Sequence, residues 1–232
     1  MGKRVFDVVV GTLLCVLALP VILAGAVVTM FALRTRSPFF THTRMGYRGE
    51  DLRFPKLRTL PTWMPAYGLK TEMAFDRTPR ASRFLRRSHI DELPQLFLVV
   101  VGKLSLVGPR PKMPDTVEPV GAVYGRTRVQ VPQGCTGLWQ ISAHKVDLPN
   151  NHPEYDLFYV ANHSLRLDAW ILVRTITNGL GMTKLITLGD VPRWARRSAA
   201  APVLQLLELD LTDAPAAVEP QPSNLKVLRA NS

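Results

Sequence analysis

The longest feature in the hydropathy pattern is an uninterrupted apolar segment near the amino terminus. Residues 8–33 carry no charge over 26 positions, and a helix of that length exceeds a hydrocarbon core of about 30 Å. Pro20 lies near the middle, where a helix loses one hydrogen bond, so we expect a kink there. The residues leave open a kinked single span and a helix that returns to its side of entry, because basic residues flank both ends: Lys3, Arg4, Arg34 and Arg36.

Beyond this segment the pattern changes to short, frequently interrupted elements. Prolines and glycines recur through residues 37–78, which predicts short strands and turns. Residues 80–101 have helix-compatible apolar spacing that is interrupted at Ser88 and again at Pro94. Ser88 is predicted to cap a helix whose first turn carries Asp91 and Glu92. The pattern therefore places an acidic pair near a helix amino terminus.

A second amphipathic helix is predicted after Ser164, a suitable capping residue. Its apolar stripe is expected to pack in the core or at a membrane interface, and consists of Leu165, Ala169, Leu172 and Ile176. After residue 190 the composition shifts to alanine and proline, which predicts a poorly ordered tail. Within this tail, residues 203–211 are the candidate for a short helix.

Composition narrows the function classes. The chain of 232 residues is 47% apolar, enough for one compact domain with a core, and its net charge of +11 suits anionic partners: nucleic acid, phosphorylated substrates or acidic lipid. Two cysteines, Cys15 and Cys135, exclude a disulfide framework and a thiolate metal cluster. The basic residues are dispersed and accompany no aromatic platform, so we expect no nucleic-acid partner.

The acidic pair is the strongest candidate for chemistry. Asp91 and Glu92 lie among the four arginines of residues 80–87, and opposite charges together with the helix dipole should keep both carboxylates ionised. An ordinary acidic first turn paired with neighbouring arginines explains the same residues, so the pair by itself leaves both interpretations open.

Longer motifs around this pair resemble a known family. FLRRSHIDELPQ at residues 84–95 and LSLVGPRP at 104–111 are similar to the signature of bacterial sugar transferases, the monotopic polyprenyl-phosphate phosphoglycosyl transferases. The likeness runs from Lys3 to about Leu180 and includes a basic block after the apolar segment, Thr136-Gly137, Tyr155-Asp156 and the segment after Ser164.

The resemblance implies a mainly α fold with a few short strands. Residues 1–36 would form a re-entrant membrane helix-hairpin broken at Pro20, and residues 37–189 a small cytosolic α/β-containing catalytic domain with interfacial amphipathic helices. Residues 190–232 would be the Ala/Pro-rich tail. The protein would lie at the bacterial inner membrane, with its catalytic domain on the cytosolic face and in contact with membrane lipids.

The resemblance also implies a reaction. Asp91 would attack a UDP-sugar, form a covalent phosphosugar intermediate and release UMP, after which undecaprenyl phosphate would accept the sugar phosphate in the first membrane step of a surface glycan pathway. Glu92 would assist as a base or orienting group, and Mg²⁺, held partly by Asp91, would neutralise the diphosphate. The further candidates for phosphate or substrate contacts are Lys56, Arg58, Arg86, Arg110, His144 and Asp156.

Several positions depart from the family pattern. Leu19 stands where many relatives carry serine, Lys103 where an acidic residue is usual, and Gln133 where proline is usual. Ala143-His144 replaces a Gly-Arg pair, so His144 or Lys145 would have to supply the positive charge, and imidazole titrates near neutrality. These departures motivate the alternative of a catalytically impaired membrane scaffold. A homodimer, the sugar transferred and the role of the tail remain open.

Overall fold

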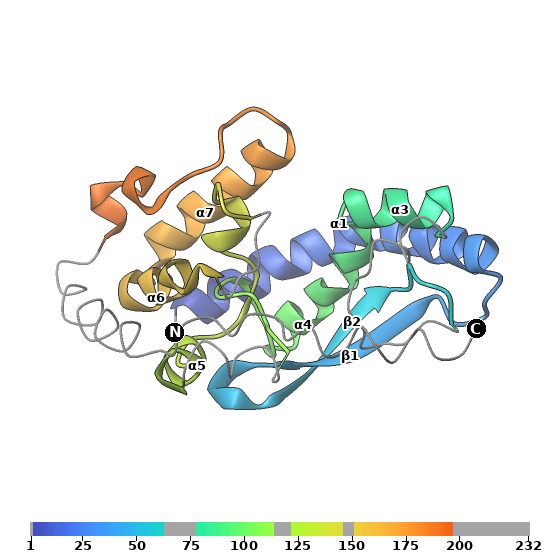
Figure 1. Cartoon of the computed structure of the whole chain (residues 1–232), viewed down its shortest axis with the longest axis horizontal. Helices are drawn as coiled ribbons and strands as arrows, with labels where there is room; N and C mark the ends of the chain where they lie inside the picture. The colour runs from blue at the N-terminus through green and yellow to red at the C-terminus, as the bar shows by residue number, and fades with distance from the viewer. Residues whose placement is uncertain (1, 63–77, 114–121, 146–150, 197–232) are drawn as a thin grey trace, which may run out of the picture.

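The computed structural model describes residues 2–62, 78–113, 122–145 and 151–196, which form a mainly helical body with a few short strands (Figure 1). The expected fold class is confirmed at this level. In chain order the main elements are α1 Gly2–Leu33, β1 Phe39–Met45, β2 Asp51–Leu57, α3 Arg80–Arg87, a 3₁₀ turn Ile90–Gln95, α4 Leu96–Val100, β3 Ser105–Val107, α5 Ala122–Arg128, β4 Gly134–Thr136, α6 Pro153–Asn162 and α7 Leu165–Gly179.

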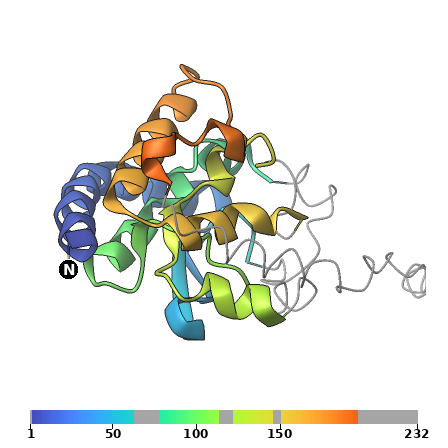
Figure 2. The same ribbon diagram turned by 90° about the vertical axis from the view of Figure 1, so that its left-hand side faces the viewer.

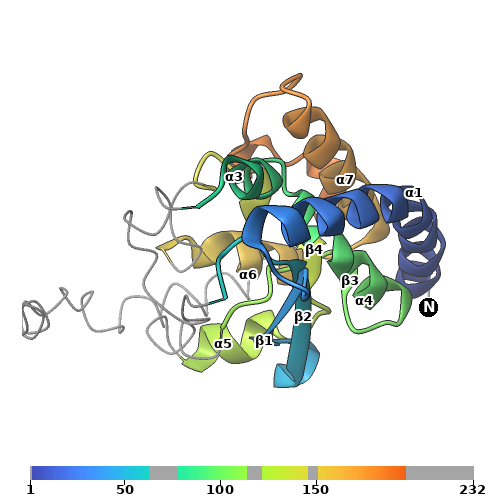
Figure 3. The same ribbon diagram turned by 90° about the vertical axis from the view of Figure 1, so that its right-hand side faces the viewer.

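The apolar segment forms one continuous helix, α1, which includes Pro20 and is long and apolar enough to cross a membrane. The two end views show that α1 changes direction part-way along (Figures 2 and 3). Small residues line the side that packs on the protein: a Cβ on Gly11 would lie 2.8 Å from Val99, and one on Gly25 would lie 2.6 Å from Leu57. The opposite side exposes large apolar side chains, including Phe31 at 81%.

Charged residues fasten the start of α1 to the rest of the body. Lys3 donates to Asp168 Oδ2 at 2.6 Å, and the buried Asp7 accepts from the Ser105 hydroxyl at 2.8 Å. Arg4 donates to the carbonyls at the end of α4, at 2.7 and 2.9 Å. These basic residues therefore anchor the helix, in addition to any interaction with lipid.

An antiparallel hairpin of β1 and β2 follows α1, with Phe39 opposite Leu57 and Met45 opposite Asp51. Because strand side chains alternate between faces, Leu52, Phe54 and Lys56 share one face of β2. This face meets the 3₁₀ turn that carries the acidic pair. The hairpin therefore brings a lysine to the carboxylates.

The helix-compatible stretch over residues 80–101, with its expected interruptions at Ser88 and Pro94, is divided into α3, the 3₁₀ turn and α4. The prediction that Ser88 caps the helix of the acidic pair is wrong: Ser88 ends α3, where its hydroxyl donates to the Phe84 carbonyl at 2.8 Å. His89 then enters the turn with φ of 55°, in the left-handed region. This reversal separates the turn of Asp91 and Glu92 from α3.

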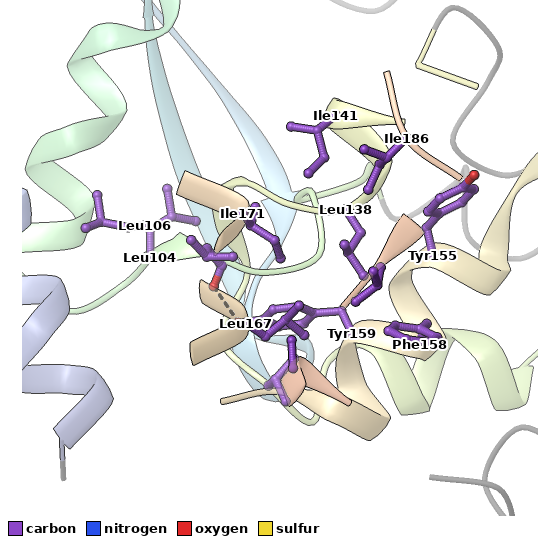
Figure 4. Packing of buried hydrophobic residues seen from close by; sticks show 14 of the residues in the cluster. Leu104, Leu106, Leu138, Ile141, Tyr155, Phe158, Tyr159, Leu167, Ile171 and Ile186 are labelled. Carbon is purple, nitrogen blue, oxygen red and sulfur yellow. Dashed lines mark hydrogen bonds between the residues drawn. The ribbon is translucent and has the colours of Figure 1, made fainter. Parts of the chain in front are cut away.

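Two segments that are distant in sequence meet as the parallel strands β3 and β4. Their backbones approach closely at glycines, because a Cβ on Gly134 would lie 2.1 Å from the Gly108 nitrogen. The main core lies beside them, where side chains from β3, α6 and α7 converge with Leu138, Ile141 and Ile186 (Figure 4).

The predicted cap of the last long helix is confirmed, since the Ser164 hydroxyl accepts from the Leu167 nitrogen at 3.3 Å. Of the apolar stripe predicted after Ser164, Leu165 is 43% and Ile176 62% exposed, which agrees with the membrane-interface alternative, whereas Leu172 packs partly buried against the core. The core instead receives Leu167 and Ile171. This difference arises because the buried face is shifted by about half a turn from the predicted stripe.

The chain continues to pack after α7. Ile186 pairs its backbone with Ile141 and Ala143, and Val191 and Ala195 are buried. Packed residues thus extend beyond the expected boundary at residue 190, whereas residues 197–232 and the helix suggested at 203–211 lie outside the described part of the chain.

Candidate active site

The 3₁₀ turn presents the two acidic side chains to different surroundings. Asp91 is 5% exposed, and its Oδ1 has no hydrogen-bond partner among the residues that the structure describes. Glu92 is paired with two cations: Lys56 Nζ lies 2.6 Å and Arg110 Nη2 2.7 Å from its Oε1. Asp91 therefore has a carboxylate oxygen without a described partner, whereas the Glu92 carboxylate is already engaged by two cations.

The surroundings of Glu92 hold it ionised. Burial by itself would raise the pKa of Glu92, but the charges of Arg110 and Lys56 and their hydrogen bonds lower it well below its ordinary value. A carboxylate with such a pKa is a weak proton acceptor near neutral pH. Glu92 is consequently placed to orient two cations.

Asp91 behaves in the opposite way. Burial raises the pKa of Asp91 to about 6, with Lys56 lowering it and Glu92 raising it further. The expectation that both carboxylates stay ionised therefore holds near neutral pH, but loss of water outweighs the nearby cations at Asp91 and raises its pKa instead of lowering it. At neutral pH the side chain is still mostly ionised.

The predicted phosphate contacts divide into two groups. Lys56 and Arg110 join Glu92 directly, and Arg86 donates to the Thr59 hydroxyl at 2.9 Å while its charge lowers the pKa of Asp91. Arg58 instead donates to the Ser37 carbonyl at 3.1 Å, beside the hairpin. The structure gathers Lys56, Arg86 and Arg110 around the acidic pair and directs Arg58 elsewhere.

The two downstream candidates lie in other clusters. Asp156 is buried and accepts from Arg128 Nε at 3.1 Å and from the Tyr124 hydroxyl at 2.8 Å. His144 stacks on His152, with ring centroids 3.9 Å apart. These partners are thus distinct from Asp91 and Glu92 within the described part of the chain, and the substrate roles of Asp156 and His144 stay predictions.

Sequence reasoning missed several residues near the site. Arg128 is fully buried and was one of many dispersed arginines. His42 is also buried, and burial together with Arg44 and Lys56 lowers its pKa to about 3, so its ring is neutral. No periodicity or motif marked either residue, because their surroundings come from segments distant in sequence.

A shallow hollow of about 460 Å³ lies on the hairpin and is lined by Thr41, His42, Thr43, Arg53 and Pro55. It contains neither carboxylate. The paired cations around Asp91 and Glu92 therefore define the candidate site better than the hollow does.

Comparison with known proteins agrees with the motif resemblance. Residues 1–181 match the family of bacterial sugar transferases. The chain belongs to this family. A relative from Caulobacter vibrioides, named UDP-glucose:undecaprenyl-phosphate glucose-1-phosphate transferase, is 35% identical over 75% of this chain and 68% of its own. The uncharacterized sugar transferase EpsL of Bacillus subtilis is 34% identical over 80% of this chain and 93% of its own.

Other relatives of this bacterial sugar transferase are longer. An Aeromonas hydrophila relative, named UDP-N-acetylgalactosamine-undecaprenyl-phosphate N-acetylgalactosaminephosphotransferase, is 32% identical over 77% of this chain and 44% of its own. The chain likewise spans 40% of the length of an uncharacterized sugar transferase from Haemophilus influenzae. The shared region therefore corresponds to a part of these relatives.

The carboxylate of Asp91 fits a magnesium ion that is shared with a substrate. Mg²⁺ is commonly bound by one or two carboxylates together with substrate phosphates, and Asp91 Oδ1 is a buried oxygen without a described partner. Within the described residues no group of three or more His, Cys, Asp or Glu side chains could hold a metal. Asp91 would therefore hold the ion jointly with the donor diphosphate, whose charge the ion would neutralise.

Proposed function

We propose that the protein transfers a sugar-1-phosphate from a UDP-sugar to undecaprenyl phosphate, as the first membrane step in making a bacterial surface glycan. The observation that carries this proposal is the pair of unlike carboxylates, Asp91 and Glu92, within a cationic cluster on a body that also carries the apolar helix α1. The names of the relatives support the substrate classes.

Asp91 is the proposed nucleophile. Its carboxylate oxygen attacks the phosphorus next to the sugar, the bond to the bridging oxygen breaks, and UMP leaves. A phosphate oxygen of undecaprenyl phosphate then attacks the same phosphorus and frees Asp91. A pKa of about 6 leaves this carboxylate ionised at neutral pH and without strong pairing, which suits attack.

Glu92 acts by orientation. It holds Lys56 and Arg110 at fixed positions, where their remaining donors bind the diphosphate. With Arg86 they supply three cations against two carboxylates, so the cluster has a net positive charge before substrate arrives. Its electrostatics favour a doubly anionic donor.

Access is the structural requirement of this mechanism. Asp91 is 5% exposed, so the diphosphate must displace neighbouring side chains when it engages the cations. The loss of water that raises the pKa of Asp91 also strengthens the attraction between the neighbouring cations and the diphosphate. Burial of Asp91 therefore favours binding of the donor as well.

The apolar helix supports a location at a membrane with the body on one face, and we place that face on the cytosolic side of the inner membrane. Both ends of α1 are attached to the same body, through Lys3 and Asp168 at one end and through Gly25 and Leu57 at the other. A helix that crosses the membrane has its two ends on opposite sides, whereas both ends of α1 contact the same domain. This arrangement favours a bent, re-entrant helix over a membrane span. Exposed apolar side chains on α1 and α7 would rest in lipid, as interfacial helices do.

UMP release tests the proposal. The full chain in detergent is mixed with magnesium, undecaprenyl phosphate and each of UDP-glucose, UDP-galactose and UDP-N-acetylgalactosamine. We expect UMP from at least one donor and none from Asp91→Asn, whereas Asp51→Asn, an exposed matched control on β2, keeps the wild-type rate. An Asp91→Asn variant that turns over normally would contradict the nucleophile role.

The buried position of Asp91 also favours the alternative of an impaired scaffold. A transferase forms a covalent sugar-phosphate adduct on the protein, and a scaffold does not. Covalent capture of radiolabelled sugar phosphate on the protein excludes a scaffold, while absence of both capture and UMP with every UDP-sugar favours it.

A further inference from the structure

A buried arginine connects the candidate site to the helices behind it. Arg128, at the end of α5, is 0% exposed. Its Nε donates to Asp156 Oδ2 at 3.1 Å, and its Nη2 donates to the backbone carbonyl of Arg110 at 2.5 Å. Arg110 is the residue whose guanidinium holds Glu92. Arg128 is therefore one residue removed from the acidic pair.

We propose that Arg128 is a positioning residue: it fixes the backbone of Arg110, so that the Arg110 guanidinium meets Glu92 in the geometry the reaction needs. This inference rests on the proposed function. It also gives Asp156 a structural partner in place of the substrate contact that the sequence suggested, because the Asp156 carboxylate is engaged by Arg128 and Tyr124.

The local chain explains why such a residue is needed. Arg110 lies between Pro109 and Pro111, and proline lacks a backbone donor and fixes its own φ. The segment follows β3, and its neighbouring backbone bond runs from the Gly134 nitrogen to the Pro109 carbonyl at 2.9 Å. The Arg110 carbonyl then takes its hydrogen bond from a side chain, and rotation of that peptide would swing the Arg110 side chain away from Glu92.

The cluster behind Arg128 is built to hold it still. The Asp156 carboxylate accepts from the Tyr124 hydroxyl at 2.8 Å, and Lys112 donates to the same hydroxyl. The backbone of Lys112 is bonded in turn to Met45 on the hairpin, at 2.8 Å. A buried charge costs several kcal/mol unless it is paired and hydrogen-bonded, and the Asp156 carboxylate, itself held by Tyr124, provides that counter-charge for residue 128.

A double-mutant cycle on UMP release tests the inference. Arg128→Lys keeps the charge but loses the forked geometry, and displacement of a reacting group by about 1 Å can lower kcat roughly 10²-fold. If Arg128 acts through Arg110, adding Arg128→Lys to Arg110→Lys has little further effect. Losses that multiply in the double variant would overturn the inference. Arg126→Lys, exposed on the same helix, is the matched control and should match wild type.

Hydrogen exchange gives a readout that does not depend on activity. In Arg128→Lys we expect faster amide exchange at Gly108, Arg110 and Lys112, the residues of segment 108–112 that carry an amide hydrogen. Exchange in α6 and the melting temperature should be close to those of Arg126→Lys. Unchanged exchange in residues 108–112, or faster exchange throughout α5 and α6, would overturn the positioning role. Absence of UMP release by the wild type would instead refute the proposed function and leave the exchange result to decide this inference.

Discussion

The two adjacent carboxylates should affect stability with opposite signs. Burial raises the pKa of Asp91 from 3.8 to about 6, and each pKa unit corresponds to about 1.4 kcal/mol. The ionised form therefore costs the folded state about 3 kcal/mol relative to the protonated form. Asp91→Asn removes this cost, so we expect the inactive variant to be more stable than wild type at neutral pH.

The pH dependence follows from the direction of the shift. Because the folded-state pKa of Asp91 is raised, its protonated form stabilises the fold fully below pH 3.8, and this contribution is lost as the pH rises through about 6. The advantage of Asp91→Asn should thus be small near pH 4 and reach its full size above pH 6. At roughly 2–4 °C per kcal/mol, the melting temperature rises by roughly 6–12 °C.

Glu92→Gln is the matched comparison at the next residue. It leaves Lys56 and Arg110 without their counter-charge, which costs about 3 kcal/mol for a largely buried pair. The pKa of Glu92 is lowered in the folded state, so its contribution is present above its ordinary pKa and is lost as the pH falls. We therefore expect Glu92→Gln to melt at a lower temperature than wild type at neutral pH.

Thermal unfolding in detergent, followed by intrinsic tryptophan fluorescence from pH 4.5 to 8, measures both variants. The reasoning is refuted if Asp91→Asn melts below wild type at pH 7.5, because the ionised carboxylate would then be stabilised by its neighbours. It is also refuted if the difference between Asp91→Asn and wild type is the same at pH 4.5 and pH 7.5.

Two further substitutions test how the body is held together, by the same melting assay. Gly134→Ala places a Cβ 2.1 Å from the Gly108 nitrogen and should separate β3 from β4, with lower stability and activity; Gly179→Ala, with nothing within 4 Å, should melt at or above the wild-type temperature. Equal melting of these two variants would contradict the close approach. Lys3→Met leaves the buried Asp168 unpaired and should cost about 3 kcal/mol. An unchanged melting temperature would show that Lys3 does not anchor α1.

Local patterns predicted much of the fold. The length of the charge-free segment required a long helix, and Ser164 marked a helix start, because both depend on residues that are neighbours in sequence. The interruption near Ser88 was predicted, but the left-handed conformation of His89 was not. A left-handed residue is a local conformation, but histidine adopts it only when the surrounding packing requires it.

The face of α7 shows a second limit of pattern reasoning. Both Leu165 and Leu167 are apolar, yet Leu167 is buried and Leu165 is 43% exposed. Where one side of a helix meets the protein core and another remains apolar, periodicity cannot tell which of the two is inside. The positions of β3 and α6 decide which face of α7 is buried.

The amino-acid sequence by itself determined the family, the acidic pair and three of the cations around it, since these are carried by contiguous motifs. The tertiary structure decided what each of these residues does. Lys56 lies 36 residues before Glu92 and Arg110 lies 18 after it, and folding brings both to one carboxylate while burying the other. Burial and charge act through space, so two neighbouring acidic residues acquire opposite pKa shifts that their order in the chain does not reveal.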